Sequence, residues 1–226
     1  MNLHPFASAG IYFIVLLCSL ALHEFAHAWV AHLRGDPLPG RQGRVTLNPF
    51  AHLDPVGSFL IPGVMIFFPL VLGAAFPVAI LGWGRPVQVS LPNPKTRRMD
   101  DILITLAGPG MNLLIALVAS VVMGVWEGLG VSPELYAFRF LLPVTIINVA
   151  LATFNLIPIP PLDGSRVLRY LVRMSEEAYA TLAANGWIIL LVLINLPSFS
   201  EFMQRLLIFM IGPFLWVVEG VASLFR

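Results

Sequence analysis

Residues 11–31 read IYFIVLLCSLALHEFAHAWVA, an apolar stretch interrupted by three ionisable side chains. Roughly 20 apolar residues are enough to cross the hydrocarbon core of a bilayer as a helix, so the stretch predicts a transmembrane helix. Ionisable groups are costly inside a membrane and mark functional sites there. The functional site is therefore expected in the helix that carries His23, Glu24 and His27, and the same helix decides the fold.

The rest of the chain is equally apolar. Of its 226 residues, 58% are hydrophobic and 11% are charged, whereas a soluble domain carries roughly 25% charged residues. Uncharged windows span 1–22, 55–84, 102–126, 140–162 and 178–200, and the apolar stretch 206–225 contains only Glu219. We expect a membrane all-α protein, a polytopic bundle of about five to six transmembrane helices. Residues 1–226 should form a single membrane-embedded domain, because the polar connections are too short for an inserted soluble one.

Basic residues predict the orientation in the cell membrane. They gather in three connections, and the segments 127–139 and 197–203 hold few or none. The three sets are Arg34, Arg41 and Arg44; Arg85, Lys95, Arg97 and Arg98; and Arg166, Arg169 and Arg173. The positive-inside rule puts all three in the cytoplasm. Since His23 and His27 lie past the middle of a helix running inward, we expect the active site toward the cytoplasmic side.

The window 55–84 has positive connections on both sides, so it should enter and leave the membrane on one face. Pro62, Pro69 and Pro77 favour a broken, re-entrant path, which is tolerated where the loosened backbone is buried in protein. A plain sixth crossing is the alternative.

Two short segments, 44–48 and 87–91, alternate apolar and polar residues with the period of a strand. We expect them to pair as a small β element at the cytoplasmic surface. Two unrelated extended loops are the alternative.

His23-Glu24-x-x-His27 is an HExxH pattern. Residues four apart on a helix lie about 40° from each other around its axis, so both imidazoles face one point. Such a pair binds zinc, and the glutamate acts as a general base. The alternative is that the histidines only form hydrogen bonds between helices.

A catalytic zinc site needs a third protein ligand, and the candidate is Asp163. It follows the uncharged window 140–162, which the predicted topology also runs from outside to inside, so it should lie at the depth of the histidines. Prolines at 158, 160 and 161 should end the preceding helix near Asn155. The alternative for Asp163 is a solvated carboxylate at a helix end.

Together these motifs resemble the site-2 proteases, zinc metalloproteases that cut substrates within or beside the membrane. The resemblance rests on His23-Glu24-x-x-His27 and on Asn155-x-x-Pro158-x-Pro160-x-x-Asp163-Gly164, and it covers most of the chain. The segment AGPGMN at 107–112 looks like the family's Gly-Pro segment, a weaker pattern. The length suggests a minimal member without a PDZ insertion or a regulatory domain.

The resemblance implies that His23, His27 and Asp163 bind Zn²⁺ and that Glu24 activates the bound water. Asn155 would donate a hydrogen bond to the scissile carbonyl oxygen, or else hold the unwound proline-rich backbone. Asn112 would contact substrate, or else bridge two helices.

Other residues have no assigned chemistry. His52 and Asp54 are candidates for a second polar or metal cluster, with turn formation as the alternative. Val87, Val89 and Leu91 would offer an exposed edge to which an extended substrate adds as a strand.

The expected function is that of an intramembrane zinc endopeptidase in regulated intramembrane proteolysis, with a non-cutting pseudoenzyme and a metal transporter as alternatives. Its partners would be the lipid bilayer and the helix of a membrane-protein substrate. That substrate could be a single-span precursor, an anti-sigma factor or a signal-peptide remnant. Nucleic acid is excluded as an expected partner by the net charge of +1 and the lack of a basic tract.

Overall fold

The first helix, α1 (Pro5–Leu33), contains the apolar stretch from which the fold was predicted. Pro5 stands in its first turn, where the missing N–H removes no hydrogen bond. Gly35 has φ 85°, the left-handed conformation with which helices commonly end. At 29 residues, α1 is roughly 43 Å long, more than the hydrocarbon core of a bilayer.

The computed structural model describes residues 4–72, 82–132 and 136–225. Apart from α1, its elements are α2 (Leu38–Arg41), η1 (Pro49–Ala51), η2 (Pro55–Leu60), α3 (Ile61–Val71), α4 (Arg97–Gly128), α5 (Tyr136–Asn155), α6 (Asp163–Leu171), α7 (Glu176–Ile194) and α8 (Pro197–Ser223).

Within these residues, four helices are long and apolar enough to cross a membrane: α1, α4, α7 and α8. The apolar part of α5, Phe140–Asn155, and the stretch Pro55–Val71 are shorter apolar helices. The prediction of a membrane all-α protein is therefore confirmed. The count of about five to six crossings stays a prediction.

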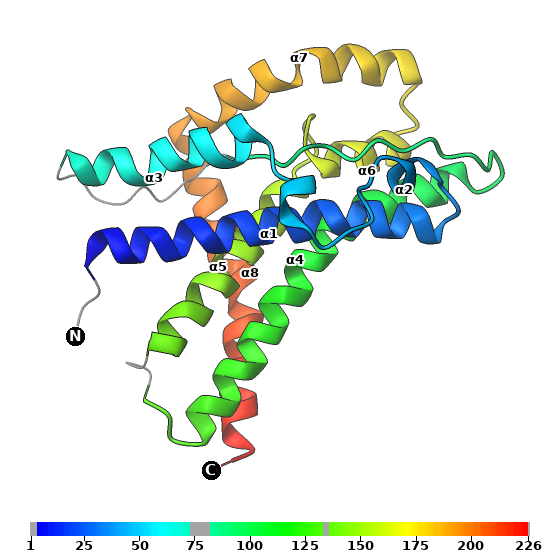
Figure 1. Ribbon diagram of the computed structural model, residues 1–226. Coiled ribbons are helices and arrows are strands. Elements are labelled where there is room, and N and C mark those ends of the chain that lie inside the picture. The colour runs from blue at the N-terminus through cyan, green and yellow to red at the C-terminus, as the bar shows by residue number, and fades with distance from the viewer. Residues whose placement is uncertain (1–3, 73–81, 133–135, 226) are drawn as a thin grey trace.

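Helix α4 is the centre of the packing. It contacts α1, α5 and α8, and Figure 1 shows α4, α5 and α8 running side by side while α1 crosses them near one end. Gly124 and Gly128 allow α8 to approach closely. A Cβ at Gly124 would lie 2.7 Å from Val218 O, and one at Gly128 would lie 2.8 Å from Ala222 O. Small residues four apart are a common way to pack helices in membranes.

The window 55–84 begins with the π-helical turn η2 and the helix α3, and residues 73–81, including Pro77, lie outside the described residues. Its two ends lie side by side. Trp83 N donates to Gly57 O at 3.1 Å, and Arg85 N donates to His52 O at 2.7 Å. Trp83 thus lies beside Gly57, so the end of the window is next to its beginning.

The predicted β element is not confirmed, because no strand occurs in the residues that the structure describes; Leu53 and Gly84 form an isolated bridge. Asp36 accepts hydrogen bonds from the backbone N–H groups of Ser90 and Leu91, and a β ladder formed by segment 87–91 would need these groups. Leu91 also has φ 47°, outside the extended region. The segments 44–48 and 87–91 are loops, as the alternative had it.

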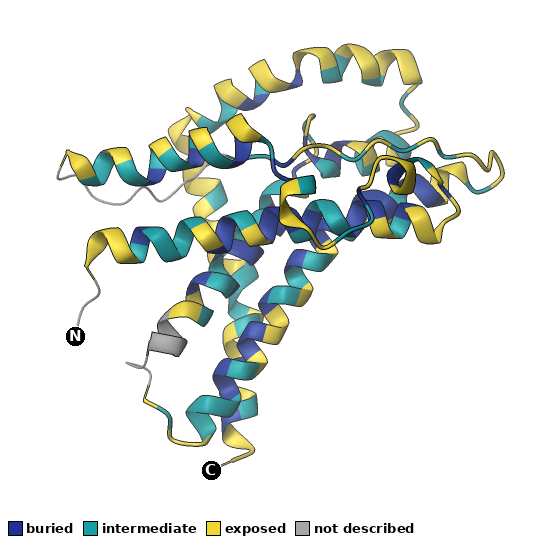
Figure 2. Cartoon of the chain, viewed as in Figure 1, coloured by how far each residue is buried: buried dark blue, intermediate teal, exposed yellow. Residues whose placement is uncertain are grey.

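Burial is concentrated where α1 meets α4. Figure 2 shows dark blue residues along the second half of α1 and on one face of α4, whereas most of α7 is exposed. The buried set includes polar residues of three helices, namely Ser19, His23, His27, Asp100, Asp101, Thr105, Asn112, Thr145 and Asn148. The polar site therefore lies inside the bundle, and the exposed apolar faces are suited to lipid.

Candidate active site

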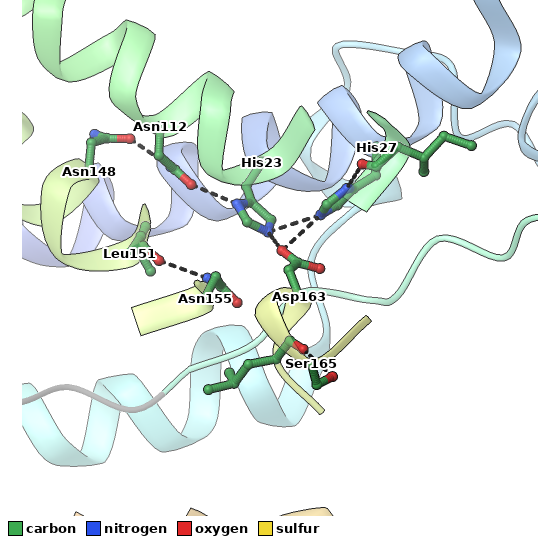
Figure 3. A network of polar contacts seen from close by, with 10 residues as sticks. His23, His27, Asn112, Asn148, Leu151, Asn155, Asp163 and Ser165 are labelled. Atoms are coloured by element: carbon green, nitrogen blue, oxygen red, sulfur yellow. Dashed lines mark hydrogen bonds and ion pairs between the residues drawn. The ribbon is translucent and has the colours of Figure 1, made fainter. Parts of the chain in front are cut away.

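His23 and His27 present their Nε2 atoms to the same point, 3.1 Å apart. Both rings are buried and held from behind through Nδ1. His27 Nδ1 lies 2.6 Å from Ile104 O, and His23 Nδ1 lies 2.6 Å from Asn112 Oδ1 (Figure 3). A backbone carbonyl can only accept, so His27 Nδ1 carries the proton and its Nε2 keeps a lone pair.

Asp163, the first residue of α6, completes the group. Its Oδ2 atom lies 3.2 Å from His23 Nε2 and 3.4 Å from His27 Nε2 (Figure 3). The next residue must be glycine, because a Cβ at Gly164 would lie 2.1 Å from Leu156 O at the end of α5. This contact brings the start of α6 against the end of α5 and points Asp163 at the histidines.

These three groups could hold a metal ion. His23 Nδ1 faces the acceptor Asn112 Oδ1, so Nδ1 carries the proton on this ring as well. Two nitrogen lone pairs and the buried Asp163 Oδ2 then face one another without a proton to share, which is unfavourable unless a cation lies between them. Zinc ligands at roughly 2.0–2.2 Å in a tetrahedron lie about 3.3–3.5 Å from each other. The observed separations of 3.1, 3.2 and 3.4 Å are close to that spacing. Among the described residues, this is the one group of three such side chains close enough to do so.

Gly108 of α4 closes the other side of the group. A Cβ built there would lie 2.4 Å from His27 Nε2 and 2.6 Å from His23 Nε2. Only glycine lets α4 pass this close to the two rings. The Gly-Pro segment singled out in the sequence is therefore part of the wall of the site.

Glu24, between the histidines in sequence, is partly buried on α1. Its side chain lies against Gly84, where a Cβ would be 2.6 Å from Glu24 Cγ and 2.9 Å from Oε1. The returning end of the window 55–84 thus forms the surface against which Glu24 rests.

Two asparagines were predicted at the site. Asn112 is fully buried and contacts His23, so it lies behind a ligand ring and joins α4 to α1. Asn155 Nδ2 donates to Leu151 O of its own helix at 2.9 Å (Figure 3). That bond lies within α5 and does not reach the proline-rich segment, so both roles stated for Asn155 stay predictions.

His52 and Asp54 act locally. His52 Nε2 lies 2.8 Å from Thr46 O, and Asp54 Oδ1 accepts from Val56 N and Gly57 N at the start of η2. Burial, followed by the nearby charge of Arg44, lowers the pKa of His52, against the effect of its bond to Thr46. The turn-forming alternative accounts for these contacts.

Segment 87–91 is fastened to the end of α1. Asp36 accepts hydrogen bonds from Ser90 N at 2.5 Å, Ser90 Oγ at 2.6 Å and Leu91 N at 3.1 Å. Although burial raises the pKa of Asp36, these bonds and one from Leu38 N outweigh it and lower the pKa overall. Val87, Val89 and Leu91 are half-buried while Gln88 and Ser90 are exposed, the alternation expected of an extended chain.

Sequence reasoning missed Ser19 and Asn148. Asn112 Nδ2 donates to Asn148 Oδ1 at 2.8 Å, and Asn148 Nδ2 donates to Ser19 Oγ at 2.9 Å. A signal existed for both. Ser19 precedes His23 by one helical turn, and Asn148 is an amide within the apolar window 140–162.

The model of peptidase family M50 matches residues 124–194, which include Asn155 and Asp163. Putative zinc metalloprotease YwhC of Bacillus subtilis is 36% identical over 200 residues, covering 86% of this chain and 84% of that protein. Putative zinc metalloprotease Rip2 of Mycolicibacterium smegmatis is 31% identical over 211 residues, covering 91% and 75%. Rip2 of Mycobacterium tuberculosis is also 31% identical, over 212 residues.

No solved structure matches the chain. The relatives align over most of their own length and share a description as zinc metalloproteases, and the chain has several apolar helices suited to a multi-pass membrane protein. Zn²⁺ is therefore the expected cofactor. On these similarities, the chain belongs to peptidase family M50, the site-2 protease family of membrane-embedded zinc metalloproteases.

Proposed function

We propose that this protein is an intramembrane zinc endopeptidase that cuts membrane-protein substrates in or next to their transmembrane segments. The observation that carries the proposal is the convergence of His23 Nε2, His27 Nε2 and Asp163 Oδ2 inside an apolar helical bundle. A buried hydrolytic centre of this kind can reach a peptide bond that lies within the membrane. The natural substrate would be a single-span membrane protein, such as a signalling precursor, an anti-sigma factor or a signal-peptide remnant, cut in regulated intramembrane proteolysis.

Each residue has a distinct role in this proposal. His23, His27 and Asp163 hold the zinc ion, which when bound polarises the scissile carbonyl and makes water more acidic. Glu24 takes a proton from the attacking water and passes it to the leaving amine. Asn155 can contribute a hydrogen bond to the carbonyl oxygen as its negative charge grows, using the amide proton not given to Leu151 O.

We place the site toward the cytoplasmic side of the cell membrane. In support, two of the three basic connections meet α4 at its start. Arg34 Nε donates to Asp100 Oδ1 at 2.6 Å, and Arg98 donates to Tyr170 O at 3.1 Å. These contacts gather the positive charges on one face, as the positive-inside rule requires of a cytoplasmic surface. The neighbouring ends of the window 55–84 support a re-entrant path for it.

Segment 87–91 is proposed to receive the substrate. A helical substrate must unwind before its peptide bond can be cut, and an extended partner can hold it by main-chain hydrogen bonds. The alternating exposure of Val87 to Leu91 supports this use. Main-chain pairing would involve residues 87–89, because Asp36 already takes the N–H groups of Ser90 and Leu91. Val89→Pro would place a ring where main-chain pairing is needed. We expect slower cleavage with unchanged zinc content, and unchanged turnover would remove this part of the proposal.

The function is tested with Glu24→Gln, assayed against a co-expressed single-span substrate. We expect zinc to be retained while cleavage falls at least about 100-fold, because a general base contributes roughly 100- to 10,000-fold. Glu219→Gln is the matched control, an exposed glutamate in the apolar helix α8. Persistent cleavage that chelators do not affect would reject the assignment. Precursors that accumulate in membranes of the Glu24→Gln strain would identify the substrate.

The orientation has its own test. Lys95→Cys and Ser198→Cys, each in a Cys18→Ala background, place single thiols at exposed positions on the two predicted sides. A membrane-impermeant maleimide should label position 198 in intact cells and position 95 only after permeabilisation. The reverse pattern would invert the proposed topology.

A further inference from the structure

Four buried polar side chains are joined by a chain of three hydrogen bonds across three helices. Ser19 and His23 lie one turn apart on α1, Asn112 lies on α4 and Asn148 on α5. His23 Nδ1 meets Asn112 Oδ1 at 2.6 Å, Asn112 meets Asn148 at 2.8 Å, and Asn148 meets Ser19 at 2.9 Å. Asn112 and Asn148 are 0% exposed. Amides so deep in an apolar bundle are costly unless every hydrogen bond is made.

One backbone carbonyl sets the direction of the bonds in this chain. Asn148 Nδ2 lies 2.8 Å from Val144 O, which can only accept, so the Asn148 amide must turn its NH₂ group that way. Its Oδ1 atom is then left to face Asn112 and to accept from Asn112 Nδ2. This in turn leaves Asn112 Oδ1 facing His23.

The orientation of Asn112 decides which nitrogen of His23, the proposed zinc ligand, carries the proton. Because Asn112 Oδ1 is an acceptor, His23 Nδ1 must carry the proton, and Nε2 must present its lone pair toward Asp163 and His27. Histidine ligands of metals usually donate their second ring N–H to such a partner, which fixes the tautomer and the ring orientation. Here that partner is Asn112, and the Asn112 amide is itself oriented by Asn148 (Figure 3).

We propose that Asn148 and Ser19 are positioning residues for zinc, acting through Asn112 to fix the tautomer and direction of His23. This inference rests on the proposed role of His23 as a zinc ligand. It adds to that role a three-helix relay in which α5 controls a ligand carried by α1. Ser19 strengthens the relay by engaging the Asn148 amide from the same helix as His23.

The first test measures zinc affinity in purified protein by competition with a chelator. Asn148→Leu keeps the size of the side chain and removes the relay, and we expect zinc affinity to fall about 10- to 100-fold, the range for such supporting partners. Ser19→Ala should have a smaller effect, because Val144 O still orients Asn148. Thr145→Val is the matched control, since this buried threonine of α5 bonds only Leu141 O in the residues described.

A purely structural role would lower the unfolding temperature without changing the metal site. Cobalt is therefore substituted for zinc, and its visible absorption is compared between Asn148→Leu and Thr145→Val. We expect a changed spectrum in the first variant and an unchanged one in the second. Equal zinc affinities and equal spectra in the two variants would overturn the proposal.

A second measurement does not depend on any variant of the relay. In wild-type protein with ¹⁵N-labelled histidine, NMR should show His23 bound to zinc through Nε2 with a proton on Nδ1, and a proton on Nε2 would overturn the proposal. His23→Gln separates this inference from the proposed function. If that change leaves zinc binding intact, the proposed site is wrong. If it abolishes zinc binding while Asn148→Leu does not weaken it, the relay alone is wrong.

Discussion

The backbone of Gly108 lies against the imidazole of His27, so closely that a Cβ at this position would be 2.4 Å from His27 Nε2. The contact joins α4 to α1 at the atoms proposed to bind zinc. A methyl group there cannot be accommodated by a small movement of a flexible side-chain end, because the ring is held from behind by Ile104 O.

Gly108→Ala should therefore lower zinc affinity, by about 10- to 100-fold if its effect matches that of losing a supporting partner. The measurement is zinc content and competition with a chelator in the purified protein. Gly110→Ala is the matched control, since a Cβ there has nothing within 4 Å. That control should be neutral or should stabilise α4 by up to about 1 kcal/mol. Full zinc affinity in Gly108→Ala would contradict this prediction and would show that α4 can move away from the two imidazole rings.

Gly84→Ala should slow the reaction while leaving zinc in place. A Cβ at Gly84 would lie 2.6 Å from Glu24 Cγ, and its three nearest neighbours are all atoms of Glu24, so the change displaces the proposed base. Displacement of a catalytic group by about 1 Å can cost roughly 100-fold. We expect a fall of about 10- to 100-fold in kcat, measured with a purified single-span substrate. Gly63→Ala, whose Cβ would make an ordinary 3.9 Å contact, should keep its rate.

Asp36→Asn should release segment 87–91. The carboxylate accepts from Ser90 N, Ser90 Oγ, Leu91 N and Leu38 N, and an amide would turn a donor toward at least one of these N–H groups. If that segment binds substrate, KM should rise several-fold while zinc affinity is unchanged. Asn93→Ala removes the neighbouring bond to Lys95 N and serves as the control. An unchanged KM would separate segment 87–91 from substrate binding.

The same carboxylate predicts a loss of stability in acid. Because the folded protein lowers the pKa of Asp36 below its ordinary 3.8, the contribution is fully present above pH 3.8 and is lost as the pH falls through the folded value. Thermal unfolding of wild type and Asp36→Asn in detergent should therefore differ at pH 6 and converge in strong acid. A difference that is independent of pH would contradict this assignment.

Tyr170 gives a prediction at the alkaline end. Burial, together with the hydrogen bond that its hydroxyl donates to Asp101 Oδ2 at 2.6 Å, raises the pKa of Tyr170 to about 12. The neutral phenol therefore adds stability below pH 10, and this stability is lost as the pH rises toward 12. Ultraviolet titration of wild type should contain a late phenolate step that Tyr170→Phe lacks. Tyrosines that all ionise near pH 10 would contradict it.

Much of the fold could be predicted because the lipid bilayer restricts the structures that an apolar chain can adopt. A long run of apolar residues has few alternatives to a membrane helix, and α1, α4, α7 and α8 all fall on windows or stretches identified by their lack of charge. The β element could not be predicted reliably. Alternation in segment 87–91 describes an extended chain, but it does not show whether a strand or the side chain of Asp36 takes its N–H groups.

The candidate site, like the fold, could be predicted only in part from the sequence. His23, Glu24 and His27 are neighbours on one helix, so their spacing alone indicates the chemistry, and Asp163 followed from topology and resemblance. Asn148 and Gly108 were different, because their importance depends on which helix faces which. Only the packing of α4 against α1 and α5 reveals the bond between Asn112 and Asn148 behind His23, and the space that Gly108 leaves for the two imidazoles.

The order in which the ribosome delivers these helices has a consequence for the cell. A nascent chain that has reached the end of α4 carries His23, Glu24 and His27, but it lacks both Asn148 and the carboxylate of Asp163. On the proposed ligand set, the metal centre is complete only after α5 has been inserted and α6 has begun. We therefore expect the unfinished protein to be inert during its own synthesis and unable to cut neighbouring chains.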